Sequence, residues 1–102
     1  FTHVSDICKG LIAAMHSDEA IGQCINLGHS DPIEIRRLIA LLERAAGRKA
    51  LIEHHPAAQG DLPITFADLT KAKRLLDYTP QVDFEAGLQE YVDWYRTWRE
   101  RC

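Results

Sequence analysis

Apolar residues recur along the chain at two spacings, and these spacings predict its elements. Residues 7–17 and 32–46 place apolar side chains three or four positions apart, which is typical of helices with one buried face. Two further helices are expected over 69–78 and from 84 onward. The stretches FTHV (1–4), QCINL (23–27) and KALIEHH (49–55) are short and bounded by turn residues, which favours strands. The expected order is β-α-β-α-β-loop-α-α, an α/β fold of short strands and about four helices, like a small α+β lobe.

Short polar side chains precede the predicted helices and can accept hydrogen bonds from unpaired N–H groups of the first turn. Ser5 or Asp6 is expected to cap the first helix. The strongest start is SDPIE, where Asp31 is the expected N-cap and Pro32 the first helical residue. Gly47 is suited to end that helix, because glycine takes the left-handed conformation easily. The other expected boundary residues are the N-caps Asp68 and Asp83 and the terminator Pro80.

The last predicted helix carries one stripe of large apolar side chains. The stripe consists of Phe84, Leu88, Tyr91, Tyr95 and Trp98. Because these residues repeat at helical spacing, we interpret them as a core-facing side rather than a cofactor site. Trp94 falls off the stripe, so we expect it to be partly exposed or to face a partner. Gly10 weakens the first helix, and we expect it to permit close packing there.

Composition limits the classes of function. The chain has 102 residues, a net charge of −3 and an isoelectric point of about 5.9, so it is one domain or part of one, without the basic face of a nucleic-acid-binding protein. The densest basic cluster, Lys71, Lys73 and Arg74, is interpreted as a solvated helix face. No apolar run is long enough to cross a membrane, and no signal-peptide pattern is present.

The cysteines and histidines do not form a ligand pattern. Cys8, Cys24 and Cys102 are widely spaced and odd in number, which indicates a reducing cytoplasm rather than a disulfide framework. We expect Cys8 and Cys24 to be small core residues and Cys102 to be a free thiol. His54 and His55 are neighbours on a predicted strand, so their side chains point to opposite faces and no metal site is expected.

The segment QGDLPITFAD (59–68) contains the most concentrated candidate chemistry. Gly60 lets the backbone approach another group closely, and Asp61 offers a carboxylate to hydroxyl donors such as a ribose. Pro63 stiffens the segment, and Thr65 adds a short donor and acceptor, while Asp68 is assigned to the next helix as its cap. The chain has neither a GxGxxG motif nor a recognisable nucleophile motif. From these residues alone, a structural turn and a ligand-binding loop are equally good interpretations.

Three blocks in order carry a resemblance to a known family. They are FTHVSDICKGL, INLGHSDPIEI and the long block from QGDLPITFADLTKAKRLLDYTP to EYVDWY. They resemble the nucleotide-sugar epimerases and dehydratases of the extended short-chain dehydrogenase/reductase family, above all UDP-glucuronate 4-epimerases. The resemblance implies that residues 1–102 are the C-terminal substrate-binding lobe of a longer enzyme. The NAD-binding Rossmann domain and the catalytic residues would lie outside this chain. Phe1 in place of an initiator Met also suggests a fragment, inactive in isolation.

The same resemblance assigns substrate-binding residues. The family's GD(L/V)P motif corresponds to 60–63, which implies that Gly60 shapes the loop and that Asp61 contacts the nucleotide. Thr65 lies where glucuronate epimerases commonly have threonine, and Phe1 matches an aromatic position beside the substrate channel. The family usually has Arg or Gln at the position of Ala58, reaching the substrate diphosphate. Gln59 is adjacent and is the candidate substitute. No catalytic, cofactor-binding or metal residue is expected in this chain.

The resulting hypothesis is a UDP-sugar-binding lobe of an NAD-dependent epimerase. The alternatives are the lobe of a nucleotide-sugar dehydratase or decarboxylase, and a non-catalytic nucleotide-binding or interaction module with the same fold, which the departure at Ala58 favours. Neither a nucleic acid nor a membrane is expected as a partner. Apolar surface that would face the missing domain, together with the edge of the first strand, predicts a homodimer or an assembly with exchanged elements.

Overall fold

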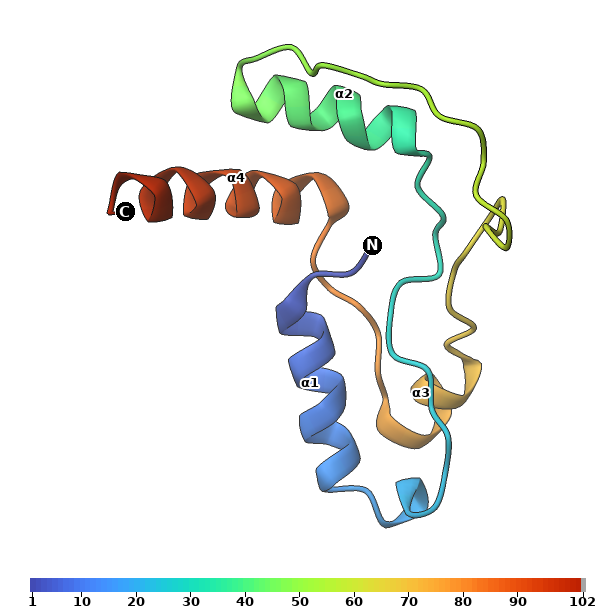
Figure 1. Ribbon diagram of the computed structural model, residues 1–102. Coiled ribbons are helices and arrows are strands. Elements are labelled where there is room, and N and C mark those ends of the chain that lie inside the picture. Colours follow the sequence, from blue (N-terminus) through green and yellow to red (C-terminus); the bar gives the residue numbers. More distant parts are fainter. Residues whose placement is uncertain (102) are drawn as a thin grey trace. The chain divides into compact units, whose positions relative to one another are not determined.

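The computed structural model describes residues 1–101, which form helices and contain no strand. The elements are α1 (Val4–Met15), the short 3₁₀ helix η1 (Asp18–Ala20), α2 (Ile35–Ala46), α3 (Thr70–Leu76) and α4 (Phe84–Glu100) (Figure 1). The chain forms two compact units, one of residues 1–32 and 66–84, the other of residues 33–65 and 85 onward. The four expected α-helices are therefore confirmed, and the expected strands are wrong.

None of the three predicted strands is formed within residues 1–101. Val4 already belongs to α1, and residues 1–3 before it have no regular structure. Residues 23–27 and 49–55 have no regular structure in the described chain. A strand needs a ladder of backbone hydrogen bonds with a neighbour. Within residues 23–27, the Cys24 carbonyl accepts a hydrogen bond from the Lys71 ammonium group at 3.1 Å and not from the backbone of a neighbouring strand.

Two helices begin at residues other than those predicted. The N-cap of α1 is His3, whose ring Nδ1 accepts the backbone N–H of Ser5 at 3.4 Å, so neither Ser5 nor Asp6 has the predicted capping role. Helix α2 begins at Ile35 after Glu34, not at Pro32. The backbone N–H of Asp31 donates to the His29 ring at 3.2 Å, which is a local turn contact and not a helix cap.

The first unit packs α1 against α3 around small residues. Ala72 is fully buried and Tyr78 is 5% exposed. A Cβ atom added to Gly10 would lie 2.7 Å from a methyl carbon of Leu27, which confirms that glycine is needed for close packing. Helix α3 ends at Asp77, which has the left-handed φ of 50°. Asparagine and aspartate tolerate this conformation better than most residues do.

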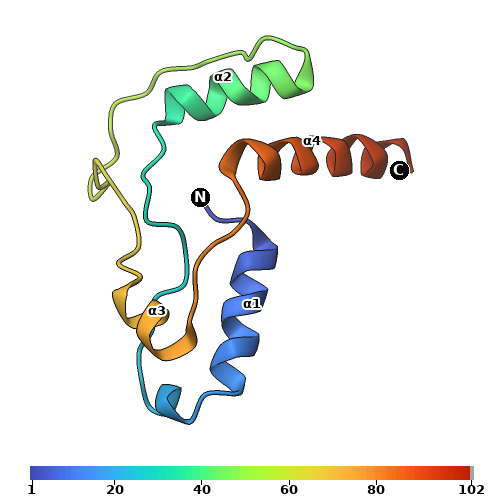
Figure 2. The ribbon, with the colours of Figure 1, turned by 180° about the vertical axis from the view of Figure 1, so that it is seen from behind.

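In the second unit, α2 and α4 lie side by side in both views (Figures 1 and 2). The Arg96 guanidinium donates to the Ala45 and Ala46 carbonyls at 2.9 and 3.1 Å, and these carbonyls belong to the last turn of α2. Such carbonyls have no partner within their own helix, so a cation there stabilises the helix end. Gly47, with a φ of 68°, ends α2 as predicted.

The aromatic stripe of α4 is not buried in this structure, contrary to the prediction. Tyr91, Tyr95 and Trp98 are 55%, 42% and 50% exposed, and Val92 on another side is the buried residue of the helix. Trp94 is 58% exposed, as predicted. The rings instead contact one another along the helix, with centroids 6.1 Å apart for Tyr95 and Trp98.

Two further predictions concern the cysteines and the membrane. Cys8 and Cys24 are exposed free thiols, so their assignment to the core is wrong, and Cys102 lies outside the described residues. Cys8 is in α1 on the side away from the buried Gly10, which explains its exposure.

Within residues 1–101, no helix combines the length and apolar character needed to cross a membrane.

Candidate functional site

The candidate loop 59–65 begins with a tight turn. The backbone N–H of Asp61 donates to the Ala58 carbonyl at 3.2 Å, and Gly60 at the third position of this turn has a φ of 97°. Gln59 does not have a positive φ, so the pattern is that of a type II turn, which requires glycine at the third position. No described atom lies within 4 Å of a Cβ built on Gly60, so close approach of a ligand there stays a prediction.

The side chains of the loop face solvent. Asp61, Thr65 and Gln59 are all exposed, and so are the neighbouring apolar residues Leu62 and Ile64, at 73% and 62%. An ionised carboxylate accepts hydrogen bonds and a threonine hydroxyl both donates and accepts. The loop therefore exposes an amide, a carboxylate and a hydroxyl group, with apolar side chains beside them, and all of these can contact a ligand.

The chain just after the loop is fixed by two contacts. The backbone N–H of Ala67 donates to the His29 carbonyl at 3.2 Å. A Cβ atom added to Gly28 would lie 3.1 Å from the Cβ of Ala67, so the two backbones pass close together. Both contacts lie within the first unit, which resumes at Phe66 directly after the loop.

Asp68 contacts the start of the next helix, although the N-cap of α3 is Leu69 and not Asp68 as predicted. Its carboxylate accepts the backbone N–H of Thr70, the first residue of α3, at 2.9 Å. The Thr70 hydroxyl and this N–H hold the pKa of Asp68 below its usual value. Asp68 is thereby distinguished from Asp61, whose carboxylate makes no such contact with the described residues.

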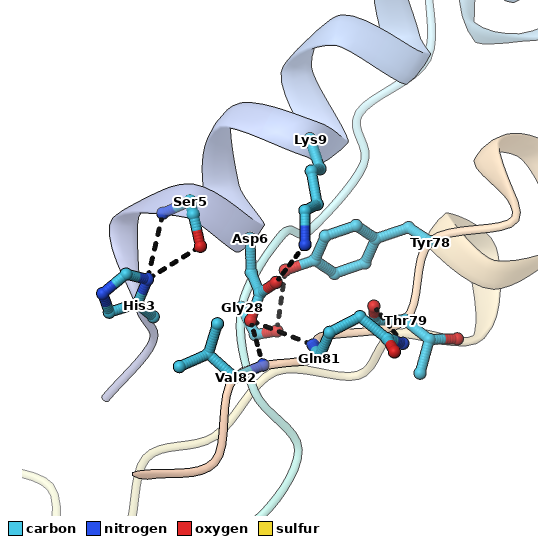
Figure 3. Close-up of polar contacts among 9 residues, drawn as sticks. All are labelled: His3, Ser5, Asp6, Lys9, Gly28, Tyr78, Thr79, Gln81 and Val82. Atoms are coloured by element: carbon cyan, nitrogen blue, oxygen red, sulfur yellow. Dashed lines mark hydrogen bonds and ion pairs between the residues drawn. The ribbon is translucent and has the colours of Figure 1, made fainter. Parts of the chain in front are cut away.

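A buried tyrosine lies behind the Gly28 contact (Figure 3). The Tyr78 hydroxyl donates to the Gly28 carbonyl at 3.1 Å. Burial raises the pKa of Tyr78, and the nearby charge of Asp6 acts in the same direction. The hydroxyl therefore remains a hydrogen-bond donor throughout the ordinary pH range.

A buried aspartate lies beside Tyr78. Asp6 is 1% exposed, and its Oδ2 accepts the backbone N–H groups of Gln81 and Val82 at 3.0 and 2.9 Å (Figure 3). The Lys9 ammonium group lies 3.5 Å from Oδ1. Burial acts to raise the pKa of Asp6, but the two N–H groups and Lys9 outweigh it, and the pKa lies below its usual value. Sequence reasoning missed this role, because Ser-Asp before an apolar run is also the signature of a cap.

The last residues to place are Phe1 and the histidine His55. The Phe1 ring is 60% exposed and packs on Phe84, with ring centroids 5.6 Å apart. Phe1 belongs to the first unit and the loop 59–65 to the second. His55 lies 3.5 Å from the Glu53 carboxylate. Within residues 1–101, no group of three or more His, Cys, Asp or Glu side chains could hold a metal ion.

Comparison with known proteins gives relatives but no matching family model. The chain is 40% identical over 96 residues to UDP-glucuronate 4-epimerase of Thermodesulfobacterium geofontis, covering 92% of this chain and 29% of that protein. It is 33% identical to UDP-glucuronate 4-epimerase 5 of Arabidopsis thaliana, covering 93% of this chain and 25% of that protein. The chain is similar to one part of the UDP-glucuronate 4-epimerases. It spans less than a third of the length of these relatives.

The fold agrees with the sequence match. The crystal structure of the UDP-glucuronic acid 4-epimerase of Bacillus cereus, in complex with UDP-glucuronic acid and NAD, superposes with a TM-score of 0.86 at 31% identity. The match covers 96% of this chain and 32% of that one. The structure is thus similar to one part of an epimerase fold, and the resemblance seen in the sequence is confirmed.

Proposed function

We propose that this chain is the C-terminal substrate-binding lobe of an NAD-dependent UDP-glucuronate 4-epimerase acting in the cytoplasm. The observation that supports it is the match of nearly the whole chain to an epimerase in complex with UDP-glucuronic acid and NAD. The residues present do not fit a dinucleotide, since the chain has no glycine-rich phosphate loop. The hydride chemistry that NAD supplies is therefore assigned to the rest of the full-length protein.

In this proposal the loop 59–65 contacts the nucleotide. The Asp61 carboxylate accepts hydrogen bonds from hydroxyl groups of the UDP-sugar, and Thr65 adds a second short polar contact. The turn closed by Asp61 N–H and the Ala58 carbonyl holds Asp61 at the start of the loop. Gln59 is the side chain offered to the diphosphate, and Phe1 is an aromatic wall of the substrate channel. Each of these residues binds or orients substrate, and none is catalytic.

The decisive experiment supplies the full-length gene product with UDP-glucuronate and NAD and follows formation of UDP-galacturonate. We expect epimerisation without loss of carbon dioxide, which separates this reaction from a decarboxylase, and without a dehydrated product. Absence of turnover with any nucleotide sugar would overturn the enzymatic proposal.

Two matched variants test the site. Asp61→Asn removes a charge from the loop, and Asp18→Asn removes the same charge from the exposed start of η1. Hydrogen bonds to charged groups contribute about 1.5–3 kcal/mol, so Asp61→Asn should raise KM about 10- to 100-fold while Asp18→Asn leaves it unchanged. Equal KM values for the two variants would exclude Asp61 from the site.

A second candidate function is a stand-alone nucleotide-binding module. The short side chain of Ala58 favours it, because the bidentate phosphate contact of an arginine is absent there. Calorimetry of UDP with the 102-residue chain tests this candidate directly. We expect weak or undetectable binding, whereas tight binding would support an independent module.

A further inference from the structure

A row of aromatic rings on α4 is about half exposed to solvent. This row, called the aromatic ladder below, consists of Tyr91, Trp94, Tyr95 and Trp98, which are 55%, 58%, 42% and 50% exposed. The rings contact one another along the helix, with centroids 5.8–6.5 Å apart. Because an aromatic side chain buries about 150–250 Å² when it is covered, the ladder leaves about 400 Å² of aromatic surface open. An exposed apolar patch of this size is typical of an interaction surface.

The side of α4 that contacts α2 is a different one. Val92 is the buried residue of α4, and Arg96 donates to the carbonyls in the last turn of α2. Glu85 forms an ion pair with Arg44 of α2. At 3.6 residues per turn, the three residues of α4 lie about a third of a turn from the middle of the ladder. The packing of α2 on α4 within this unit therefore leaves the ladder uncovered.

Two residues of opposite charge border the ladder at its two ends. Glu90 lies four residues before Trp94, and Arg101 lies three residues after Trp98, so each is beside a ring of the ladder on the helix surface. Both charged residues are exposed. They are eleven residues apart, which is about three helical turns, so they lie on the same side of the ladder. Two such surfaces are complementary in charge when the helices run antiparallel.

We propose that the aromatic ladder is the contact surface of a homodimer, in which α4 of a second copy lies antiparallel against α4 of the first. A two-fold axis at the middle of the ladder places Tyr91 of each copy opposite Trp98 of the other. The same axis places Trp94 opposite Tyr95, so every ring meets a ring. The proposal does not depend on the proposed function, because no substrate takes part in this contact.

The bordering charges fit the same two-fold axis. The midpoint between Glu90 and Arg101 lies one residue from the midpoint of the ladder, which is about 1.5 Å along the helix. Glu90 of each copy is thereby brought to Arg101 of the other, as a self-complementary interface requires. A parallel arrangement would instead bring Glu90 to Glu90 and Arg101 to Arg101. Charge complementarity therefore selects the antiparallel dimer.

The size of the ladder predicts a reversible dimer. A standard interface buries roughly 800 Å² on each partner, and the ladder supplies about half of that area. The side chains that border the ladder supply part of the remainder. We therefore expect a dissociation constant in the micromolar range, within reach of sedimentation measurements.

The first test asks whether the chain dimerises and whether the ladder is covered when it does. Sedimentation velocity of the 102-residue chain, from low to high micromolar concentration, should give a monomer–dimer equilibrium. Trp94 and Trp98 are the only tryptophans of the chain, so acrylamide quenching of tryptophan fluorescence reports on the ladder. Quenching should fall about 2-fold as the dimer forms, because half-exposed rings become buried. A chain that stays monomeric, or that associates with unchanged quenching, overturns the proposal.

The second test exchanges the bordering charges. Because the interface is two-fold, Glu90→Arg and Arg101→Glu each replace two attractive contacts by two repulsive ones. Each variant should raise the dissociation constant about 10-fold at low salt and less at high salt. An equimolar mixture of the two variants has opposite charges at both contacts again and should dimerise like the wild type. Glu53→Arg makes the same charge change at an exposed residue of the same unit and should leave the dissociation constant unchanged.

The mixture separates a broken contact from a broken fold. A variant that fails to dimerise because it is unfolded does not recover on mixing, and circular dichroism identifies it; the quenching of the wild type then decides the proposal. If both variants keep the circular dichroism of the wild type and their mixture does not recover, the antiparallel pairing is refuted. An equal effect of Glu53→Arg would assign the change to net charge and would also refute it.

Discussion

Removing the buried Asp6 carboxylate should destabilise the chain more than any exposed substitution. Asp6→Ala deletes the acceptor of the Gln81 and Val82 N–H groups, at 3.0 and 2.9 Å, and the partner of Lys9. Hydrogen bonds to a charged group contribute about 1.5–3 kcal/mol each, and the two share one oxygen and are not additive. We expect a loss of about 3 kcal/mol in the free energy of unfolding. Asp6→Asn keeps one carbonyl oxygen and should lose about 1 kcal/mol.

The same contacts predict how stability depends on pH. The pKa of Asp6 is lowered in the folded chain from its ordinary value of 3.8. The unfolded chain therefore binds the proton first as pH falls, and the stabilisation by Asp6 is complete above the unfolded pKa. It is lost as pH decreases through the lowered folded pKa. The stability difference between the wild type and Asp6→Asn should accordingly shrink below about pH 4.

Urea denaturation monitored by tryptophan fluorescence and circular dichroism at several pH values measures both effects. At neutral pH the midpoint should fall in the order wild type, Asp6→Asn, Asp6→Ala, with similar m-values. Asp18→Asn, an exposed aspartate in the same unit, is the charge-matched control and should behave like the wild type. A loss below about 1 kcal/mol for Asp6→Ala, or a wild-type-to-Asn difference that does not change with pH, would refute the reasoning.

Three other outcomes follow from single contacts. Gly60→Ala should cost about 1 kcal/mol in thermal denaturation, because alanine is strained at a φ of 97°; an unchanged melting temperature would contradict the type II turn. Gly10→Ala should cost about 1–3 kcal/mol through overlap with Leu27, and a second change, Leu27→Ala, should relieve the overlap. Trp94→Ser together with Trp98→Ser should lower the sedimentation mass of any oligomer, because both rings are at least 50% exposed; a monomeric wild type would remove the premise.

The sequence predicts the helices well where the information is local. The helical spacing of apolar residues indicates all four α-helices, and Gly47 and Asp77 end α2 and α3 in left-handed conformations. The Asp68 carboxylate accepts the N–H of the first residue of α3, although the predicted N-cap position falls on Leu69. A helix cap, an apolar stripe along a helix and a left-handed residue at a helix end each depend on residues only a few positions apart. These features can therefore be predicted from a single sequence.

The partners of Asp6 and Tyr78 could not be predicted in this way. Asp6 binds N–H groups more than seventy positions later, and Tyr78 binds a carbonyl fifty positions earlier. No periodicity relates such positions. The Ser-Asp pair even indicated a local cap, a role that His3 takes instead through its ring nitrogen. The distant contact prevails over the local one because two backbone donors converge on one carboxylate in a buried place.

The strands and the aromatic face fail as predictions for one common reason, which is that both depend on a partner. The stretch KALIEHH is short and has Leu and Ile at its centre, but a strand is stable only when a neighbour completes its hydrogen bonds. The stripe on α4 has the spacing of a core face, yet Tyr91 and Trp98 remain half exposed. The loop 59–65 differs, because the turn at its start is closed by residues of the loop itself. The site hypothesis at Asp61 rests on the family resemblance, and the local turn explains only how the start of the loop keeps its shape although the predicted strand before it is not formed.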